Sequence, residues 1–193
     1  MRKFCLTIIV LAGFSKALFA QFGNCTASEM QTYTDRETGN TITILTDTLK
    51  NDRFLYQTDP MWTHDGKYLL FRSSSRANDK KIERTLPNGE KRSWTPTQIY
   101  FIEMATGQII QATEGPDLGS AFLANKSNRM FISRKEKEDW NMYVMDLDKF
   151  FADVKKGKVG KPTAYETLLG TFPTSMGRPG GYAIDCNDDY AYI

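Results

Sequence analysis

The chain has 193 residues, with three cysteines, one histidine and a formal net charge of +2. A single histidine and the lack of any Cys-x-x-Cys pair exclude the usual zinc clusters. The small net charge gives no indication of a nucleic-acid partner.

The N-terminal sequence MRKFCLTIIVLAGFSKALFA has the order of a secretory signal. Arg2 and Lys3 precede an apolar run over residues 4–14, and small residues lead up to Ala20. The run is too short to span about 30 Å of hydrocarbon, which disfavours a membrane anchor. We therefore expect cleavage after Ala20 and a periplasmic or secreted domain over residues 21–193, with no membrane attachment.

Removal of this signal takes away three basic residues and no acidic one, so the formal net charge falls from +2 to −1. Cys25 and Cys186 remain in the mature chain. In an oxidising compartment they can form a disulfide or stay as two free thiols, and the sequence does not choose between these states.

Three segments share one pattern: MWTHDGKYLLF (61–71), FLANKSNRMFI (122–132) and YAIDCNDDYAYI (182–193). Each has apolar residues, a polar turn and then alternating apolar residues, which is the pattern of a β-hairpin. Their last residues are separated by two successive intervals of 61 positions. The regular interval indicates an internal repeat.

A second pattern alternates with the first. RETGNTITILT (36–46) and MATGQIIQAT (104–113) both contain Thr-Gly, a short strand and a closing threonine. The strand at 98–104 precedes the second of these, and MYVMDL (142–147) repeats that strand in the next unit.

In chain order, one unit has strands at 59–63, 68–72, 98–104 and 108–113. Four antiparallel strands repeated in this way form the blade of a β-propeller. We therefore predict an all-β fold, an incomplete propeller of roughly three four-stranded blades, with a β-sandwich as the alternative. DKFFADVKKGK (148–158) has apolar residues at helical spacing and predicts one short amphipathic helix.

The third repeat stops within its last strand, and 173/61 gives about 2.8 units for the mature chain. Propellers typically close with four to eight blades. We therefore expect the N-terminal part of a larger propeller, with assembly of several chains into one ring as the alternative.

Several stretches carry a resemblance to known families. TGQIIQATEG after QIYFIEM, and WTHDGKYLLF, resemble the repeats of TolB-like propellers, whose turn usually reads SPDG where this chain has Thr63-His64-Asp65-Gly66. DRETGNTITILT followed by FLYQTDPMWTHDGKYLLF is similar to the opening of oligogalacturonate lyases and related propeller polysaccharide lyases. The resemblance covers about residues 30–147, but the later repeats lack Asp-Gly. It implies cleavage of uronate-containing, pectic-type oligosaccharides.

His64 lies in the tight turn between the first two strands, where the family has proline. That position favours a backbone role in the turn, with a catalytic or metal role as the alternative.

The loops on the opposite face of the blades are basic. Residues 73–97 contain six basic and three acidic side chains, a local excess of +3. Arginines pair with carboxylates and aromatic rings stack on sugars, so this face suits an acidic oligosaccharide. A solvated loop is the alternative, and a protein partner is also possible. The candidate substrate-binding residues are Gln57, Arg76, Trp94 and Arg178.

β-Elimination from a uronate needs a base for the proton beside the carboxylate and a cation that neutralises the developing charge. Tyr56 is the candidate base and Arg72 the candidate cation. The resemblance implies a catalytic histidine and arginine and a histidine-rich manganese site in later blades. No histidine follows His64, so we assign no metal or cofactor to this chain and expect it to be inactive by itself. The alternative function is a non-catalytic TolB-like propeller that binds protein or glycan.

Overall fold

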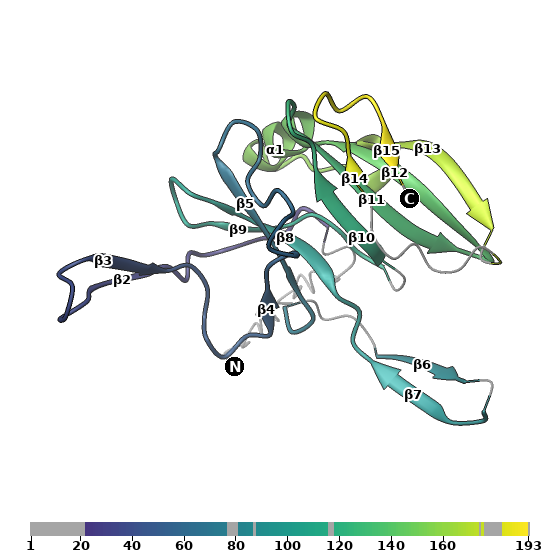
Figure 1. Cartoon of the computed structure of the whole chain (residues 1–193), viewed down its shortest axis with the longest axis horizontal. Coiled ribbons are helices and arrows are strands. Elements are labelled where there is room, and N and C mark those ends of the chain that lie inside the picture. Colours follow the sequence, from purple (N-terminus) through teal and green to yellow (C-terminus); the bar gives the residue numbers. More distant parts are fainter. Residues whose placement is uncertain are drawn as a thin grey trace, which may run out of the picture.

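The fold is built from small antiparallel sheets in a computed structural model (Figure 1). The structure describes residues 22–76, 81–86, 88–115, 118–173, 175 and 183–192. Among these residues, two larger sheets form the body, three two-stranded hairpins lie outside them, and one α-helix is present. No helix in this part of the chain has the length and hydrophobicity that a membrane crossing needs.

The first sheet has the strand order β1-β9-β8-β5-β4. These strands are β1 (Cys25–Thr26), β9 (Ile109–Gln111), β8 (Gln98–Glu103), β5 (Tyr68–Ser73) and β4 (Asp52–Arg53). β5, β8 and β9 confirm the last three strands predicted for one unit. Their order along the chain is also their order in the sheet, as in a propeller blade.

The strand predicted at 59–63 is reduced to a short contact with β5. Trp62 forms an isolated bridge with Leu69, and the N–H of Leu70 donates to the carbonyl of Met61 at 2.7 Å. Pro60 has no backbone N–H that could donate a hydrogen bond to a neighbouring strand, and this limits pairing at the start of the segment. β4 instead pairs with the far end of β5.

The second sheet is four-stranded, in the order β10-β11-β12-β13. Its strands are β10 (Leu118–Leu123), β11 (Arg129–Glu136), β12 (Asp139–Asp146) and β13 (Glu166–Pro173). Helix α1 (Leu147–Lys155) and the short helix η1 (Pro162–Ala164) connect the last two strands. This confirms the predicted helix, which begins where the Asp146 carboxylate accepts from the Lys149 N–H at 2.9 Å.

The main core lies where α1 and the two sheets meet. Phe150 and Phe151 of α1 are buried, and the Phe151 ring stacks on Tyr68 with centroids 3.7 Å apart. Phe22, from the start of the described chain, packs on Phe150 at 5.0 Å. The aromatic residues of the helix therefore serve packing, as their spacing predicts.

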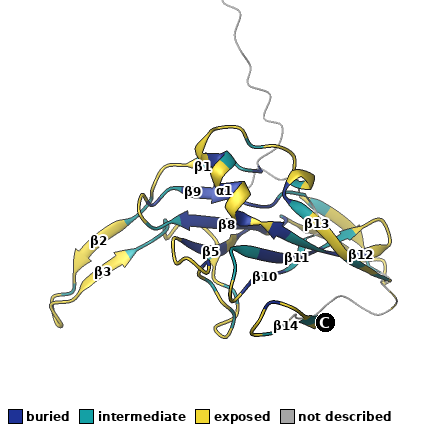
Figure 2. Cartoon of the chain, turned by 90° about the horizontal axis from the view of Figure 1, so that it is seen from above, coloured by how far each residue is buried: buried dark blue, intermediate teal, exposed yellow. Residues whose placement is uncertain are grey.

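The three hairpins are β2 (Gln31–Thr34) with β3 (Thr41–Ile44), β6 (Ile82–Thr85) with β7 (Lys91–Trp94), and β14 (Ala183–Ile184) with β15 (Ala191–Tyr192). Two of them, β2–β3 and β6–β7, extend away from this body (Figure 1), and β2 and β3 are exposed except for the half-buried Ile44 (Figure 2). β6 and β7 belong to the basic segment 73–97, which is thus partly a hairpin.

The interval of 61 residues is reproduced by one hydrogen bond in three turns. Thr63 donates to Tyr68 at 3.0 Å, and the same backbone bond recurs 61 and 122 positions later, at 2.9 and 3.0 Å. Neighbouring turns also contact each other: His64 Nδ1 lies 2.9 Å from the carbonyl of Asn125, and Asp188 accepts from the Asn125 N–H at 2.6 Å. The His64 ring therefore joins two turns, which supports its structural interpretation.

Candidate functional site: an electropositive pocket

Strand ends and loops of both sheets enclose a pocket of about 820 Å³. Of the predicted residues, the structure brings Tyr56, Arg72 and Trp94 together in its wall. Gln57 follows Tyr56 in the same turn and is exposed, but it does not line the pocket. Arg178 lies outside the described residues.

Positive charge dominates the described lining. Its basic residues are Arg53, Arg72, Arg84 and Lys135, and its acidic residue is Asp59. Four cations against one carboxylate leave an excess of +3 in a confined space. Such a cavity raises the local concentration of anions.

Two of these arginines face each other. Arg53 of β4 and Arg72 of β5 are direct partners in the ladder, and both are exposed to the pocket. Like charges directly opposite on neighbouring strands repel each other. Within the described chain no ion pair joins either guanidinium to a carboxylate, although Arg53 Nε donates to Asn51 Oδ1 at 3.2 Å. An anionic ligand between them would relieve this repulsion.

Aromatic surface lies beside the charges. The Arg84 guanidinium lies over the Trp94 ring, 5.6 Å from its centroid, which orients both side chains along the β6–β7 hairpin. Tyr56 is largely exposed in a turn held by the Asp59 N–H, which donates to the Tyr56 carbonyl at 2.9 Å. Trp140 of β12 contributes buried surface from the second sheet. Rings and guanidinium groups together match the apolar faces and carboxylates of an acidic sugar.

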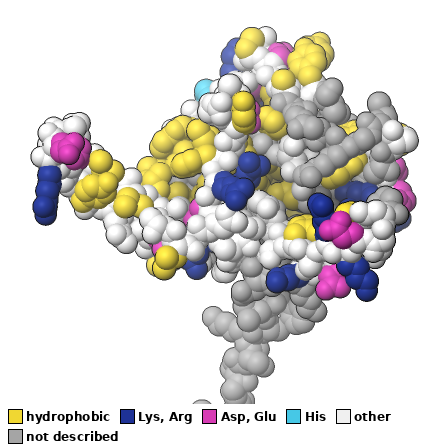
Figure 3. Space-filling view, turned by 60° about the horizontal axis from the view of Figure 1, so that its bottom comes forward, with side chains coloured by type: hydrophobic (Ala, Val, Ile, Leu, Met, Phe, Trp, Pro, Cys, Tyr) yellow, Lys and Arg dark blue, Asp and Glu magenta, His cyan; other side chains and the backbone are white. Residues whose placement is uncertain are grey.

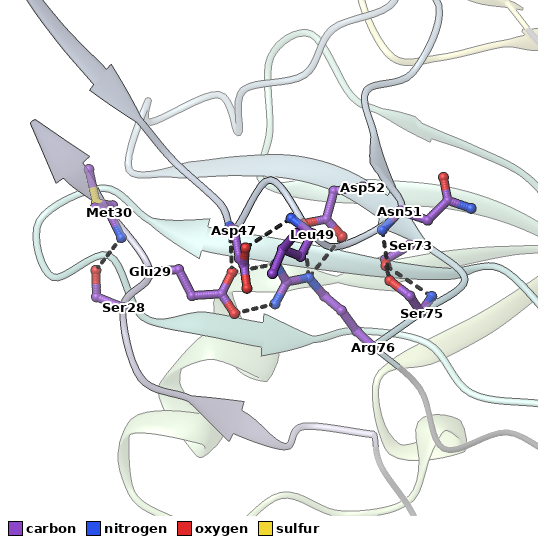
Figure 4. A network of polar contacts seen from close by, with 10 residues as sticks. All are labelled: Ser28, Glu29, Met30, Asp47, Leu49, Asn51, Asp52, Ser73, Ser75 and Arg76. Atoms are coloured by element: carbon purple, nitrogen blue, oxygen red, sulfur yellow. Dashed lines mark hydrogen bonds and ion pairs between the residues drawn. The ribbon is translucent and has the colours of Figure 1, made fainter.

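Arg76 has a different role from the predicted one (Figure 4). Its side chain is only 7% exposed, and it bonds both Glu29 and Asp52. Nε donates to Asp52 Oδ1 and Nη1 to Glu29 Oε1, each at 2.9 Å. The hydrogen bonds from Arg76 lower the Glu29 pKa to about 2. Because two carboxylates use the whole fork, Arg76 fixes the N-terminal segment to the first sheet instead of binding substrate.

Sequence reasoning missed the contribution of the second sheet. Lys135 and Trp140 lie in the segment 133–141, whose three basic and three acidic residues cancel, so its net charge does not indicate a binding site. Gly119 of β10 allows Trp140 to pack closely, since a Cβ at this position would meet Ser133 Oγ and approach Trp140 Cζ3 to 2.9 Å. A glycine inside a strand is the one local signal for this close approach.

The described residues do not fit a manganese site. They contain no group of three histidine, cysteine, aspartate or glutamate side chains that could hold a metal ion. His64 lies at the contact between turns and is not part of the pocket lining. Cys25 and Cys186 are both free thiols in this structure.

No family model and no curated protein matches the chain. Among solved structures, it is similar to an oligogalacturonate lyase in complex with manganese, with a TM-score of 0.52 and 21% identity. The match covers 79% of this chain and 32% of that one. A second oligogalacturonate lyase, from Vibrio parahaemolyticus, matches with a TM-score of 0.48 and 23% identity, over 67% of this chain and 29% of that one. The chain therefore spans about a third of the length of these structures, and it shares the fold of the matched part of the first one.

Proposed function

We propose that this chain is part of a propeller polysaccharide lyase that binds uronate-containing, pectic-type oligosaccharides in the electropositive pocket. The observation that carries the proposal is the facing pair Arg53 and Arg72, which lacks a carboxylate partner within the described chain. A uronate carboxylate between the two guanidinium groups would accept charge-assisted hydrogen bonds from both. The likeness of the fold to an oligogalacturonate lyase supports the same substrate class.

In this proposal Arg72 neutralises the uronate carboxylate while a base removes the neighbouring proton, because negative charge builds on the carboxylate during β-elimination. The electrons of the broken C–H bond form the new double bond, and the glycosidic oxygen leaves. Tyr56 and Asp59, both in the described pocket wall, are the candidate groups that accept the proton. The variants Tyr56→Phe and Asp59→Asn would show which of the two groups is the base.

Binding is tested by titrating the mature chain with oligogalacturonate and following the heat released. The double variant Arg53→Ala, Arg72→Ala should lose most of the affinity, whereas Arg36→Ala on the exposed β2–β3 turn should retain it. A neutral oligosaccharide of equal length should bind poorly to every variant. Equal affinity for the neutral sugar would refute recognition through the arginines.

Cleavage is tested separately, through the ultraviolet absorbance of the unsaturated product. Because the described pocket lining contains no histidine, binding without turnover is the expected result for this chain alone. That result would also fit a non-catalytic glycan-binding propeller. Turnover that is lost in Tyr56→Phe or Asp59→Asn would establish a lyase and identify its base. Export through the N-terminal signal, to the periplasm or the medium, is part of the proposal.

A further inference from the structure

The β6–β7 hairpin forms part of the pocket wall at its base and extends away from the body beyond it (Figure 1). Arg84 of β6 and Trp94 of β7 line the pocket, and Pro96 and Thr97 continue the lining towards β8. Figure 3 shows basic and acidic side chains together at the right, where Figure 1 has β6 and β7. The charges that can reach a ligand therefore depend on the face of the hairpin that each residue occupies.

The register of the hairpin separates its charges by face. Residues two apart on a strand share a face, and so do direct partners on neighbouring strands. Arg92 is two residues from Trp94, and its direct partner is Arg84, so these three side chains share the pocket face. Glu83 and Lys91 each lie one position away from an arginine and therefore occupy the opposite face. Within the two strands, the pocket face carries both arginines and the other face carries the acidic residue.

Arg92 lies outside the described pocket lining and continues the pocket face outward past Trp94. Two residues along a strand correspond to about 6.8 Å. The Arg92 side chain is 66% exposed, and its Nε lies 3.9 Å from the Glu90 carboxylate, which is itself 55% exposed. Exposed ion pairs of this kind contribute little to stability, so they compete weakly with a ligand. The Arg92 guanidinium is therefore accessible to a ligand that extends out of the pocket.

The pair of Arg84 and Arg92 repeats the arrangement of Arg53 and Arg72. In each pair, two arginines lie directly opposite each other on antiparallel strands. Like charges in this position destabilise a strand pair, so an anion beside either pair is stabilising. Trp94, next to the second pair, is 37% exposed and offers apolar ring surface. A chain of uronates presents a carboxylate on each sugar and apolar ring faces between them, which matches this alternation.

We propose that the β6–β7 hairpin is a second carboxylate-binding element, in which Arg92 with Arg84 binds another uronate of the chain whose first uronate lies between Arg53 and Arg72. Trp94 packs against a sugar ring of the same chain. This inference rests on the proposed function and adds a determinant of specificity to it. A single uronate occupies one arginine pair, whereas an oligomer of uronates reaches both. Arg92 therefore selects for ligands that carry several carboxylates.

The experiment titrates the full chain with galacturonate and with tetragalacturonate, using nuclear magnetic resonance for the weaker ligand. The native chain should bind tetragalacturonate more tightly. Arg92→Ala should weaken tetragalacturonate binding roughly tenfold, the usual effect of losing a charge-assisted hydrogen bond, and leave galacturonate binding unchanged. Lys91→Ala is the matched control, because it removes the same charge from the neighbouring residue on the opposite face of the hairpin. It should retain the affinity for both ligands.

Equal weakening of tetragalacturonate binding by Arg92→Ala and Lys91→Ala would show that the hairpin acts only through its net charge, and it would overturn the proposal. An equal effect of Arg92→Ala on both ligands, or no effect on either, would overturn it as well. In each of these cases the proposed function stands if the double variant Arg53→Ala, Arg72→Ala still loses tetragalacturonate binding. Full binding by that double variant would refute the proposed function and this inference with it.

Discussion

Arg72 and Arg76 are four residues apart, one just before and one within the basic segment 73–97, yet the structure uses them in opposite ways. Arg72 is exposed in the pocket and faces another arginine, whereas Arg76 is buried between two carboxylates. The Arg72 region keeps its charge available for a ligand at the expense of repulsion between neighbours. The Arg76 region consumes its charge in a packed contact. The number of basic residues in a segment therefore overestimates its capacity for binding.

The largest expected effect is on stability, from Arg76→Ala. This change leaves Asp52, whose side chain is 8% exposed, without its cation. Removal of one partner from a buried ion pair costs about 3 kcal/mol or more in the free energy of unfolding. Urea denaturation would measure this loss, with Arg72→Ala as the control on the same segment. Similar losses in the two variants would show that the distinction between the arginines is wrong.

The next effect is on affinity, from Arg72→Ala. Loss of a charge-assisted hydrogen bond, worth about 1.5 kcal/mol or more, should weaken oligogalacturonate binding roughly tenfold. The unfolding free energy should stay constant or rise slightly, because the repulsion from Arg53 is removed. Calorimetric titration and denaturation of the same samples test both statements. Unchanged affinity would remove Arg72 from the site.

Acid should weaken the contact between Glu29 and Arg76. The pKa of Glu29 is about 2, below its ordinary value of 4.5, and the largest cause is the hydrogen bonding from Arg76. A carboxyl with a lowered pKa contributes its full stability above its ordinary pKa and loses it as the pH falls through the folded value. The difference in unfolding free energy between the native chain and Glu29→Gln should therefore be constant above about pH 4.5 and vanish near pH 2. A constant difference over this whole range would contradict the ion pair.

Salt should separate the regions further. The arginines of the pocket are open to solvent, and exposed charges are screened over about 8 Å at physiological ionic strength. Oligogalacturonate affinity should therefore fall with added sodium chloride, while the stability difference caused by Arg76→Ala should change little. A series of titrations and denaturation curves at increasing salt compares the two responses. Affinity that is independent of salt would argue against an electrostatic pocket.

The smallest effect is expected for His64→Pro, which touches neither region. It removes the contact between His64 Nδ1 and the Asn125 carbonyl, and an ordinary hydrogen bond contributes about 1 kcal/mol. Stability should fall by about that amount, with no change in oligogalacturonate affinity. Thermal denaturation and titration provide the measurements. Lost binding in a folded variant would give this histidine a functional role.

Local sequence patterns predicted most of the regular structure. Alternating apolar residues and polar turns indicated β5, β8 and β9, and the helical spacing of Phe150, Phe151 and Val154 indicated α1. These signals depend on residues that are close along the chain, so they can be read directly. The segment 59–63 was overestimated, because a favourable pattern does not ensure a partner along its whole length.

The sequence alone determined the repeat of 61 residues, the hairpins within it, and a basic face that carries Tyr56, Arg72 and Trp94. Only the tertiary structure decided which charges remain available. It brings Glu29 and Asp52, 47 and 24 residues away, to Arg76, and it adds Lys135 from the second sheet to the pocket. Backbone periodicity follows from neighbouring residues, whereas the partner of a charged side chain depends on segments that meet only after the chain has folded.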